Sequence, residues 1–89
     1  MACFKIVWKQ SAQKELRKLP TEAVARIVNL VEGLAQNPSP PGAKKLAGTE
    51  SFYRVRTGDY RVVYNLMKDI LVVEVIRVGH RKKVYRHLS

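Results

Sequence analysis

The sequence predicts an α+β domain in which two helices pack on one face of a small, mainly antiparallel sheet. Three observations support this class: an alternating run near the N-terminus, two segments of helical periodicity before residue 38, and three β-rich runs after residue 51. The resulting order is an N-terminal strand, a two-helix hairpin and a three-stranded antiparallel meander. Since 89 residues with 46% hydrophobic content suffice for one small core, we expect a single domain over residues 1–89.

The first predicted elements are a strand and a short helix. Bulky apolar side chains alternate with other residues over Phe4–Lys9, which is the period of a strand with one buried face. Ser11 is the expected N-cap of the first helix, and Pro20 is expected to end it. This helix places its apolar residues on one side and basic residues on the other.

The second predicted helix has the strongest amphipathic pattern in the chain. Thr21 is its expected N-cap, and Asn37-Pro38 is its expected end. Its apolar residues repeat at helical spacing: Val24, Ile27, Val28, Val31 and Leu34. The following Asn37–Gly42 segment, NPSPPG, is predicted to be a loop because its prolines fix φ and lack amide donors.

The stretch Phe52–Tyr64, FYRVRTGDYRVVY, is typical of an antiparallel hairpin with Gly58 and Asp59 as its loop. The expected pairs are Thr57 with Tyr60, Arg56 with Arg61, Val55 with Val62, Arg54 with Val63 and Tyr53 with Tyr64. One face then carries Tyr53, Val55, Val62 and Tyr64, which the helices would cover. The other face carries three arginines, of which Arg56 and Arg61 lie opposite each other. Like charges in that position destabilise a sheet unless an anion lies across them.

The C-terminal part is predicted to be one more strand and a basic tail. Lys68 and Asp69 form the expected turn, and the run Ile70–Val78, ILVVEVIRV, indicates a strand buried on both faces. Gly79 is expected to break this strand. The tail HRKKVYRHLS follows.

Composition points to a polyanionic partner. The chain has 17 Lys and Arg against 7 Asp and Glu, a formal net charge of +10, which favours nucleic acid. With Cys3 as the only cysteine, two histidines and no paired carboxylates, we expect no metal site and no cofactor. The sequence shows no signal peptide and no run long enough for a membrane span, so we expect a cytoplasmic protein with no membrane partner.

A cationic cluster with one tyrosine suits RNA cleavage without metal, in which the ribose 2′-hydroxyl attacks the adjacent phosphate. Guanidinium groups stabilise the charge of the transition state, and Tyr85 stacks on a base or orients the hydroxyl. His80 is the member of the cluster whose side-chain type readily gives and takes a proton at neutral pH. The candidate cluster is Arg54, Arg56, Arg61, His80, Arg81 and Tyr85.

Simpler interpretations remain open for these residues. The arginines also fit a solvated or partner-facing sheet surface, the HRKK run an exposed tail, and Tyr85 a packing anchor. Lys44 and Lys45 precede the hairpin on an exposed approach, where they contact phosphate or only water. The candidate RNA-binding residues are Lys44, Lys45, Arg54, Lys82, Lys83 and Arg86.

Three segments resemble the RelE/ParE superfamily of bacterial and archaeal toxins, and specifically its RelE-type mRNA interferases: SAQKELRKLP, KKLAG leading to FYRVRTGDYRVVY, and VIRVGHRKKVYRH. The resemblance implies a RelE-like fold and the toxin of a type II toxin–antitoxin system. It implies an endoribonuclease that enters the A site of the 70S ribosome and cuts mRNA by 2′-hydroxyl attack, leaving a 2′,3′-cyclic phosphate and inhibiting translation. A RelB-type antitoxin is the implied partner.

The resemblance also assigns roles by position. Arg61 and Arg81 match arginines that bind the scissile phosphate, and the second is also proposed to protonate the leaving group. Tyr85 matches a tyrosine that stacks on the substrate. Arg54 and Arg56 stand where the best-studied members have lysines, one of them the proposed general base, and arginine holds its proton more tightly. Arg56 therefore acts only electrostatically, or else His80 takes part of the proton transfer, which is our hypothesis.

Two other functions fit the same pattern. One is a ParE-type toxin, which has this fold but poisons DNA gyrase and cuts no RNA. The other is a basic binding module without catalysis. The set Arg56, Arg61, Arg81 and Tyr85 favours the nuclease, because a gyrase binder has no need of these groups around one phosphate.

Overall fold

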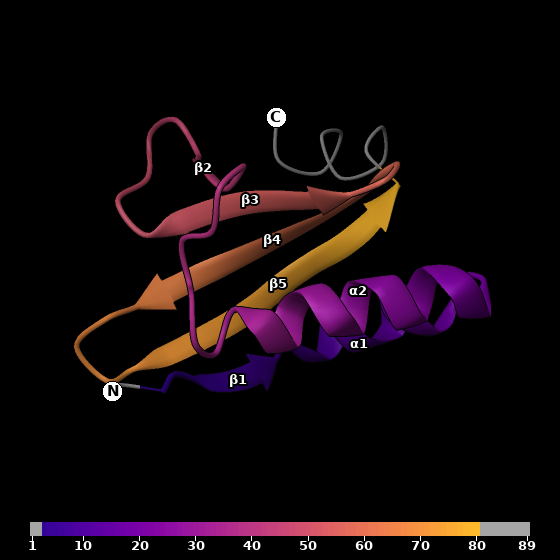
Figure 1. The fold of residues 1–89 in the computed structure, drawn as a ribbon, viewed down its shortest axis with the longest axis horizontal. Helices are drawn as coiled ribbons and strands as arrows, with labels where there is room; N and C mark the ends of the chain where they lie inside the picture. Colours follow the sequence, from indigo (N-terminus) through magenta and orange to yellow (C-terminus); the bar gives the residue numbers. More distant parts are fainter. Residues whose placement is uncertain (1–2, 81–89) are drawn as a thin grey trace.

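The computed structural model describes residues 3–80 and shows a five-stranded sheet with two helices on one face (Figure 1). The predicted α+β class is confirmed. The elements are β1 (Lys5–Trp8), α1 (Gln10–Arg17), α2 (Thr21–Gly33), β2 (Lys44–Lys45), β3 (Phe52–Thr57), β4 (Tyr60–Met67) and β5 (Val72–His80).

The strand order across the sheet is β1-β5-β4-β3-β2. Strands β3, β4 and β5 form the predicted antiparallel meander, and β1 pairs in parallel with β5. The chain that connects these two parallel neighbours runs through both helices and the strands β2, β3 and β4. The two-residue strand β2 was not predicted, and it pairs antiparallel with β3 at the far edge of the sheet.

The hairpin register is confirmed at every predicted pair. Thr57 pairs with Tyr60 and Arg56 with Arg61, and the ladder continues to Phe52 and Asn65. Gly58 has a φ of 59°, whereas Asp59 has no positive φ. A positive φ at the first loop residue alone is typical of a type II′ turn, whose twist matches that of the two strands.

Both predicted N-caps are wrong. Helix α1 begins at Gln10 with Lys9 as its N-cap, and α2 begins at Thr21 with Pro20 as its N-cap; neither has a side-chain cap hydrogen bond. Ser11 instead lies in the first turn of α1. Pro20 has an extended backbone (φ −59°, ψ 151°), so the N-cap falls on the proline and Thr21 is already helical.

Helix α2 is shorter than predicted. It ends at Gly33 rather than at Asn37-Pro38, and the next residues continue in tighter turns, as in the bond from the Leu34 amide to the Val31 carbonyl. The Ala35 carbonyl accepts a 2.7 Å hydrogen bond from the Phe4 amide. This bond anchors the start of the chain beside the end of α2.

The last strand is displaced toward the C-terminus from its predicted position. Ile70 and Leu71 belong to the preceding turn and are 65% and 41% exposed. The prediction that Gly79 breaks the strand is wrong, because β5 continues to His80 and Gly79 pairs with Arg61. The predicted burial on both faces is also wrong, since burial along β5 is uneven and Glu74 and Ile76 are only partly buried. The helices pack against only one face of the sheet (Figure 1).

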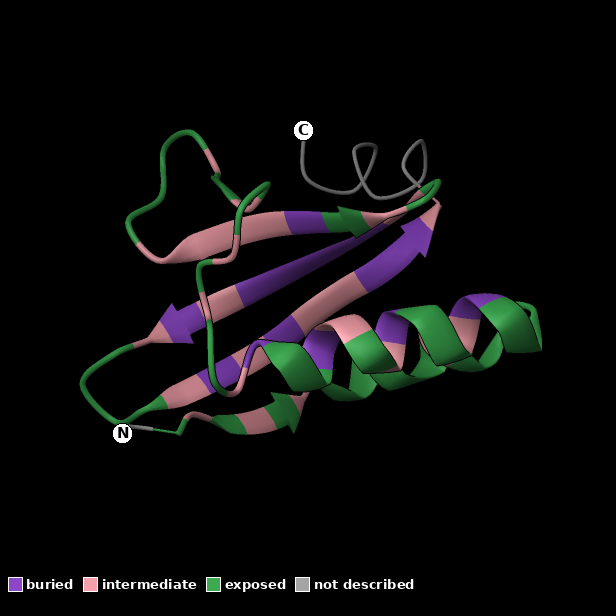
Figure 2. Ribbon diagram, viewed as in Figure 1, coloured by how far each residue is buried: buried purple, intermediate pink, exposed green. Residues whose placement is uncertain are grey.

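The core lies between that face and the helices, where Figure 2 shows buried residues on α2 and the middle strands. Its buried members are Ala12, Ile27, Val31, Leu34, Val55, Val62, Tyr64, Leu66, Val73, Val75 and Val78. The Tyr64 hydroxyl donates a 2.6 Å hydrogen bond to the Pro38 carbonyl, and its ring stacks on Tyr53 at 5.8 Å. Burial raises the pKa of Tyr64 to about 12. The predicted inward face of the hairpin is confirmed.

Among the helices of residues 3–80, none is long and apolar enough to cross a membrane.

Candidate anion-binding site

Three arginines lie on the face of the β3–β4 hairpin that points away from the helices. Arg56 and Arg61 are direct cross-strand partners, and Arg54 follows at the next position on the same face. Arg61 is only 7% exposed, Arg54 is partly buried and Arg56 is exposed. The structure therefore contains the unfavourable arginine pair that the sequence predicted, and it concentrates positive charge on this face.

A pocket of about 270 Å³ opens beside β3 at the start of β2. Its lining residues are Gly42, Lys44, Arg54, Val55 and Arg56. Lys44 pairs with Arg54, and Gly42, just before β2, has a positive φ of 93°. Three cationic residues around a small pocket suit an anion such as a phosphate group.

Backbone geometry adds a donor to this pocket. The Leu46 amide donates to the Phe52 carbonyl, so the even-numbered residues of β3 direct their backbone groups toward β2. Arg56 continues this alternation on the side of Arg54 where β2 has not yet begun. Its amide therefore points to the open edge, beside the guanidinium groups.

Lys45 is not part of this cluster. It pairs with Tyr53, one position from Lys44, and alternation along a strand sends the two lysine side chains to opposite faces. Lys45 lines a different pocket, which also contains Glu50 and Asp69. These carboxylates make that pocket a poorer site for phosphate.

His80 also lies apart from the arginines. It pairs with Tyr60, and the two rings meet edge to face at 6.0 Å. Tyr60 packs against the core, whereas the neighbouring pair, Arg61 and Gly79, faces the other way. Because β5 continues through Gly79, alternation places the His80 side chain on the helix-covered face and Arg61 on the opposite face.

The remaining candidate residues fall outside the described part of the chain. They are Arg81, Lys82, Lys83, Tyr85 and Arg86.

Sequence reasoning missed one interaction at the end of β5. Glu15 on α1 forms a 2.7 Å ion pair with Arg77, and its other carboxylate oxygen accepts a 3.1 Å hydrogen bond from the Val78 amide. The signal in the sequence is that Glu15 is the single carboxylate of the helix segment QSAQKELR. A lone acid on a basic helix indicates a specific partner.

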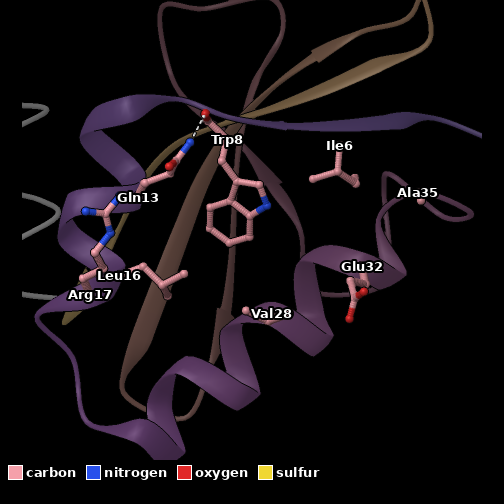
Figure 3. Close-up of a pocket in the computed structure, with 8 residues that line it drawn as sticks. All are labelled: Ile6, Trp8, Gln13, Leu16, Arg17, Val28, Glu32 and Ala35. Atoms are coloured by element: carbon pink, nitrogen blue, oxygen red, sulfur yellow. Dashed lines mark hydrogen bonds between the residues drawn. The ribbon is translucent and has the colours of Figure 1, made fainter.

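Another cavity has a different character. It is an open groove of about 580 Å³ between β1 and the two helices, shown in Figure 3. Its lining residues are Ile6, Trp8, Gln13, Leu16, Arg17, Val28, Glu32 and Ala35. Gln13 donates a 3.1 Å hydrogen bond to the Trp8 carbonyl. The groove is mostly apolar, so it does not suit a phosphate, and within residues 3–80 no three His, Cys, Asp or Glu residues gather as metal ligands.

Comparison with known proteins identifies the family. A family model described as the ParE toxin of type II toxin–antitoxin systems, parDE, matches residues 6–85. Toxin RelG of Mycobacterium tuberculosis is 31% identical over 87 residues, which cover 93% of this chain and 97% of that protein. The chain belongs to the RelE/ParE superfamily of type II toxins.

Solved structures of this superfamily share the fold. The toxin–antitoxin complex RelBE2 of M. tuberculosis contains a chain with a TM-score of 0.79 and 26% identity, covering 89% of this chain and 99% of that chain. The archaeal RelE–RelB complex of Pyrococcus horikoshii OT3 contains a chain with a TM-score of 0.78 and 28% identity, covering 91% of this chain and 97% of that chain. This RelE-like toxin therefore has the predicted RelE-like fold, on which its arginine cluster and cationic pocket are built.

Proposed function

We propose that this RelE-like toxin is a metal-independent endoribonuclease that cuts mRNA in the A site of the ribosome. The observation that carries the proposal is the convergence of Lys44, Arg54 and Arg56 on one pocket, with Arg61 directly opposite Arg56. Placing like charges together costs stability in the free protein. A phosphodiester backbone across the pair offsets that cost, which links the arrangement to an RNA substrate.

The chemistry follows from the charges. When the ribose 2′-hydroxyl attacks the adjacent phosphate, the pentacoordinate transition state carries more negative charge than the ground state. Guanidinium groups already fixed on a sheet stabilise that extra charge without reorganising. Because a guanidinium group holds its proton tightly, we assign to Arg56 an electrostatic contribution rather than the role of general base.

Proton transfer is assigned to His80 as a hypothesis, with Arg81 and Tyr85 in the roles that the family resemblance implies. His80 lies at the end of β5 beside Tyr60, on the face of the sheet opposite Arg61. Contact of His80 with a substrate ribose therefore requires the RNA to bind across the end of the sheet. The test is His80→Gln in the ribosome-dependent reaction. An unchanged cleavage rate with an unchanged pH profile rules out proton transfer by His80.

The proposed partners are a RelB-type antitoxin, the 70S ribosome and mRNA. Two structural neighbours were solved as complexes of RelE with RelB, which supports the first partner. The formal charge of +10 supports polyanionic partners in general, and ribosomal RNA is one.

The deciding experiment incubates the protein with programmed ribosomes and maps cuts by primer extension. We expect cuts within the A-site codon that persist in the presence of a metal chelator at a concentration that leaves the ribosomes intact. The alternative, a gyrase poison, is kept because the matching family model is named for ParE. Gyrase-dependent DNA breaks without mRNA cleavage would establish that alternative.

A further inference from the structure

The C-terminal part of β5 extends beyond its neighbour β1. The last residue of β1, Trp8, pairs with Val75, and the last ladder bond runs from the Lys9 amide to the Val75 carbonyl at 2.9 Å. The remaining residues of β5 would leave backbone donors and acceptors on an open edge, which frays readily in water. This stretch includes Gly79, the partner of Arg61.

Helix α1 closes this edge with side chains instead of a strand. A β-bulge at Ile76 shifts the alternation of β5, so that the Ile76 carbonyl and the Val78 amide both face α1. The Ser11 hydroxyl donates to the Ile76 carbonyl at 3.4 Å, and Glu15 Oε1 accepts from the Val78 amide at 3.1 Å. The two side chains take the place of the next residues of β1.

A second bond fixes the orientation of the Glu15 carboxylate. Its Oε2 accepts a 2.7 Å hydrogen bond from Arg77 Nη2, and the Arg77 and Glu15 side chains are only 23% and 27% exposed. Charge-assisted bonds in partly buried positions are among the strongest side-chain contacts. One carboxylate thus holds two consecutive residues of β5.

We infer that Glu15 is a positioning residue for the nuclease site. Through the Val78 amide it holds the end of β5 against β4, and so keeps Gly79 in register with Arg61. It contacts neither the pocket nor the proposed substrate. This inference rests on the proposed function, and it assigns to α1 a part in catalysis beyond its packing in the core.

The test compares three variants of the full chain. Glu15→Ala removes both bonds, whereas Glu15→Gln loses the charge but keeps an oxygen that accepts from the Val78 amide. Glu22→Ala is the matched control, because it removes an exposed carboxylate from the first turn of α2 and so lowers stability away from β5. Each variant is measured by amide hydrogen exchange at Val78 and by kcat and KM for cleavage on programmed ribosomes.

We expect Glu15→Ala to exchange the Val78 amide about tenfold faster and to lose about tenfold in kcat with little change in KM, because a small displacement of a fixed group is costly in catalysis. Glu15→Gln should keep most of the wild-type kcat, and Glu22→Ala all of it. Equal losses in Glu15→Ala and Glu15→Gln, or a Glu15→Ala protein with wild-type exchange and kcat, would overturn the assignment. A wild-type protein that cuts no RNA refutes the proposed function instead, and the exchange measurement still reports whether Glu15 holds Val78.

Discussion

The two edges of the sheet end in opposite ways. At one edge, β2 has only two residues, so β3 passes it and opens a pocket lined by Lys44, Arg54 and Arg56. At the other, β5 passes β1, but α1 covers the overhang and its Glu15 carboxylate holds two residues of β5. At both edges a strand extends past its neighbour, but only the β5 edge is covered.

The difference lies in what completes each edge. Glu15 supplies a negative charge from within the chain, so the β5 edge is closed and needs no partner. The β3 edge gathers positive charge, and under the proposed function the RNA backbone is the anion that binds there. This comparison predicts that a substitution at the cationic edge lowers activity with little change in the free energy of unfolding. A substitution in the core, or in the turn that supports this edge, should mainly lower the free energy of unfolding.

The largest effect is expected at the arginine pair. Arg61→Ala should lower the rate of A-site cleavage by about 10²–10³-fold, the loss typical for one preorganised donor to a transition-state anion. Arg56→Ala should lower the cleavage rate by a smaller factor. Arg56 is exposed, so water screens its charge, whereas Arg61 is only 7% exposed. The measurement is single-turnover cleavage on programmed ribosomes.

The same substitutions also test the cost of the pair. Because like charges lie directly opposite, Arg56→Ala should raise the free energy of unfolding by about 0.2–1 kcal/mol while activity falls. Lys68→Ala, in the exposed turn before β5, is the control with the same loss of charge. A fall in activity of equal size in Lys68→Ala would mean that net charge, and not the pair, is responsible.

Tyr64 provides the sharpest test of the core beneath the hairpin. Tyr64→Phe removes the hydrogen bond to the Pro38 carbonyl and should lower the free energy of unfolding by about 1–3 kcal/mol, the usual cost of a partly buried group left without its donor. Urea unfolding at neutral pH measures this difference.

The pH dependence of that difference has a defined sign. Burial raises the pKa of Tyr64 to about 12, above the ordinary value of 10.0 that it regains in the unfolded chain. The contribution of Tyr64 is therefore complete below pH ~10 and is lost as the pH rises toward ~12. Since Phe does not titrate, the gap between wild type and Tyr64→Phe should narrow over that window. A constant gap would show that the hydroxyl titrates normally.

Gly58 tests the turn that sets the register of the arginine pair. Its φ of 59° is a conformation that L residues adopt at a cost of about 1–2 kcal/mol, so Gly58→Ala should destabilise the protein by that amount. An added Cβ meets the Arg26 guanidinium at 3.5 Å, which is ordinary contact, so the cost is one of backbone strain. Gly33→Ala, where φ is negative and the space is open, is the control and should not destabilise.

The sequence was most informative where local chemistry decides the structure. The Gly58-Asp59 loop sets the hairpin register, and the register sets which faces carry Arg56 and Tyr64; all of these predictions are confirmed. Predictions were wrong where a distant contact decides. Nothing near Gly79 in the sequence shows that pairing with β4 carries the strand through it.

The candidate site was predictable to the same extent. Arg54, Arg56 and Arg61 lie together as the alternation of the hairpin requires, because their placement depends on one turn. The position of His80 depends instead on how far β5 continues, and the contacts of Glu15 depend on which helix covers the edge of β5. Both are features of the tertiary structure. Because a strand break was predicted at Gly79, His80 was assigned to the basic tail rather than to the last residue of β5.

The smallest effect is expected at Lys44, on the rim of the cationic pocket. If its contact with RNA is a single phosphate, Lys44→Ala should weaken binding by a few-fold and lower the slope of log affinity against log salt by about 0.7–0.9. Lys45→Ala is the control, because Lys45 lies on the other face of the sheet and lines a pocket with Glu50 and Asp69. A smaller salt slope for Lys44→Ala together with an unchanged slope for Lys45→Ala locates the RNA backbone at the open edge of β3. Equal salt slopes for the two variants would mean that the lysine charges act on RNA from a distance. The open edge of β3 would then not be a specific site for the RNA backbone.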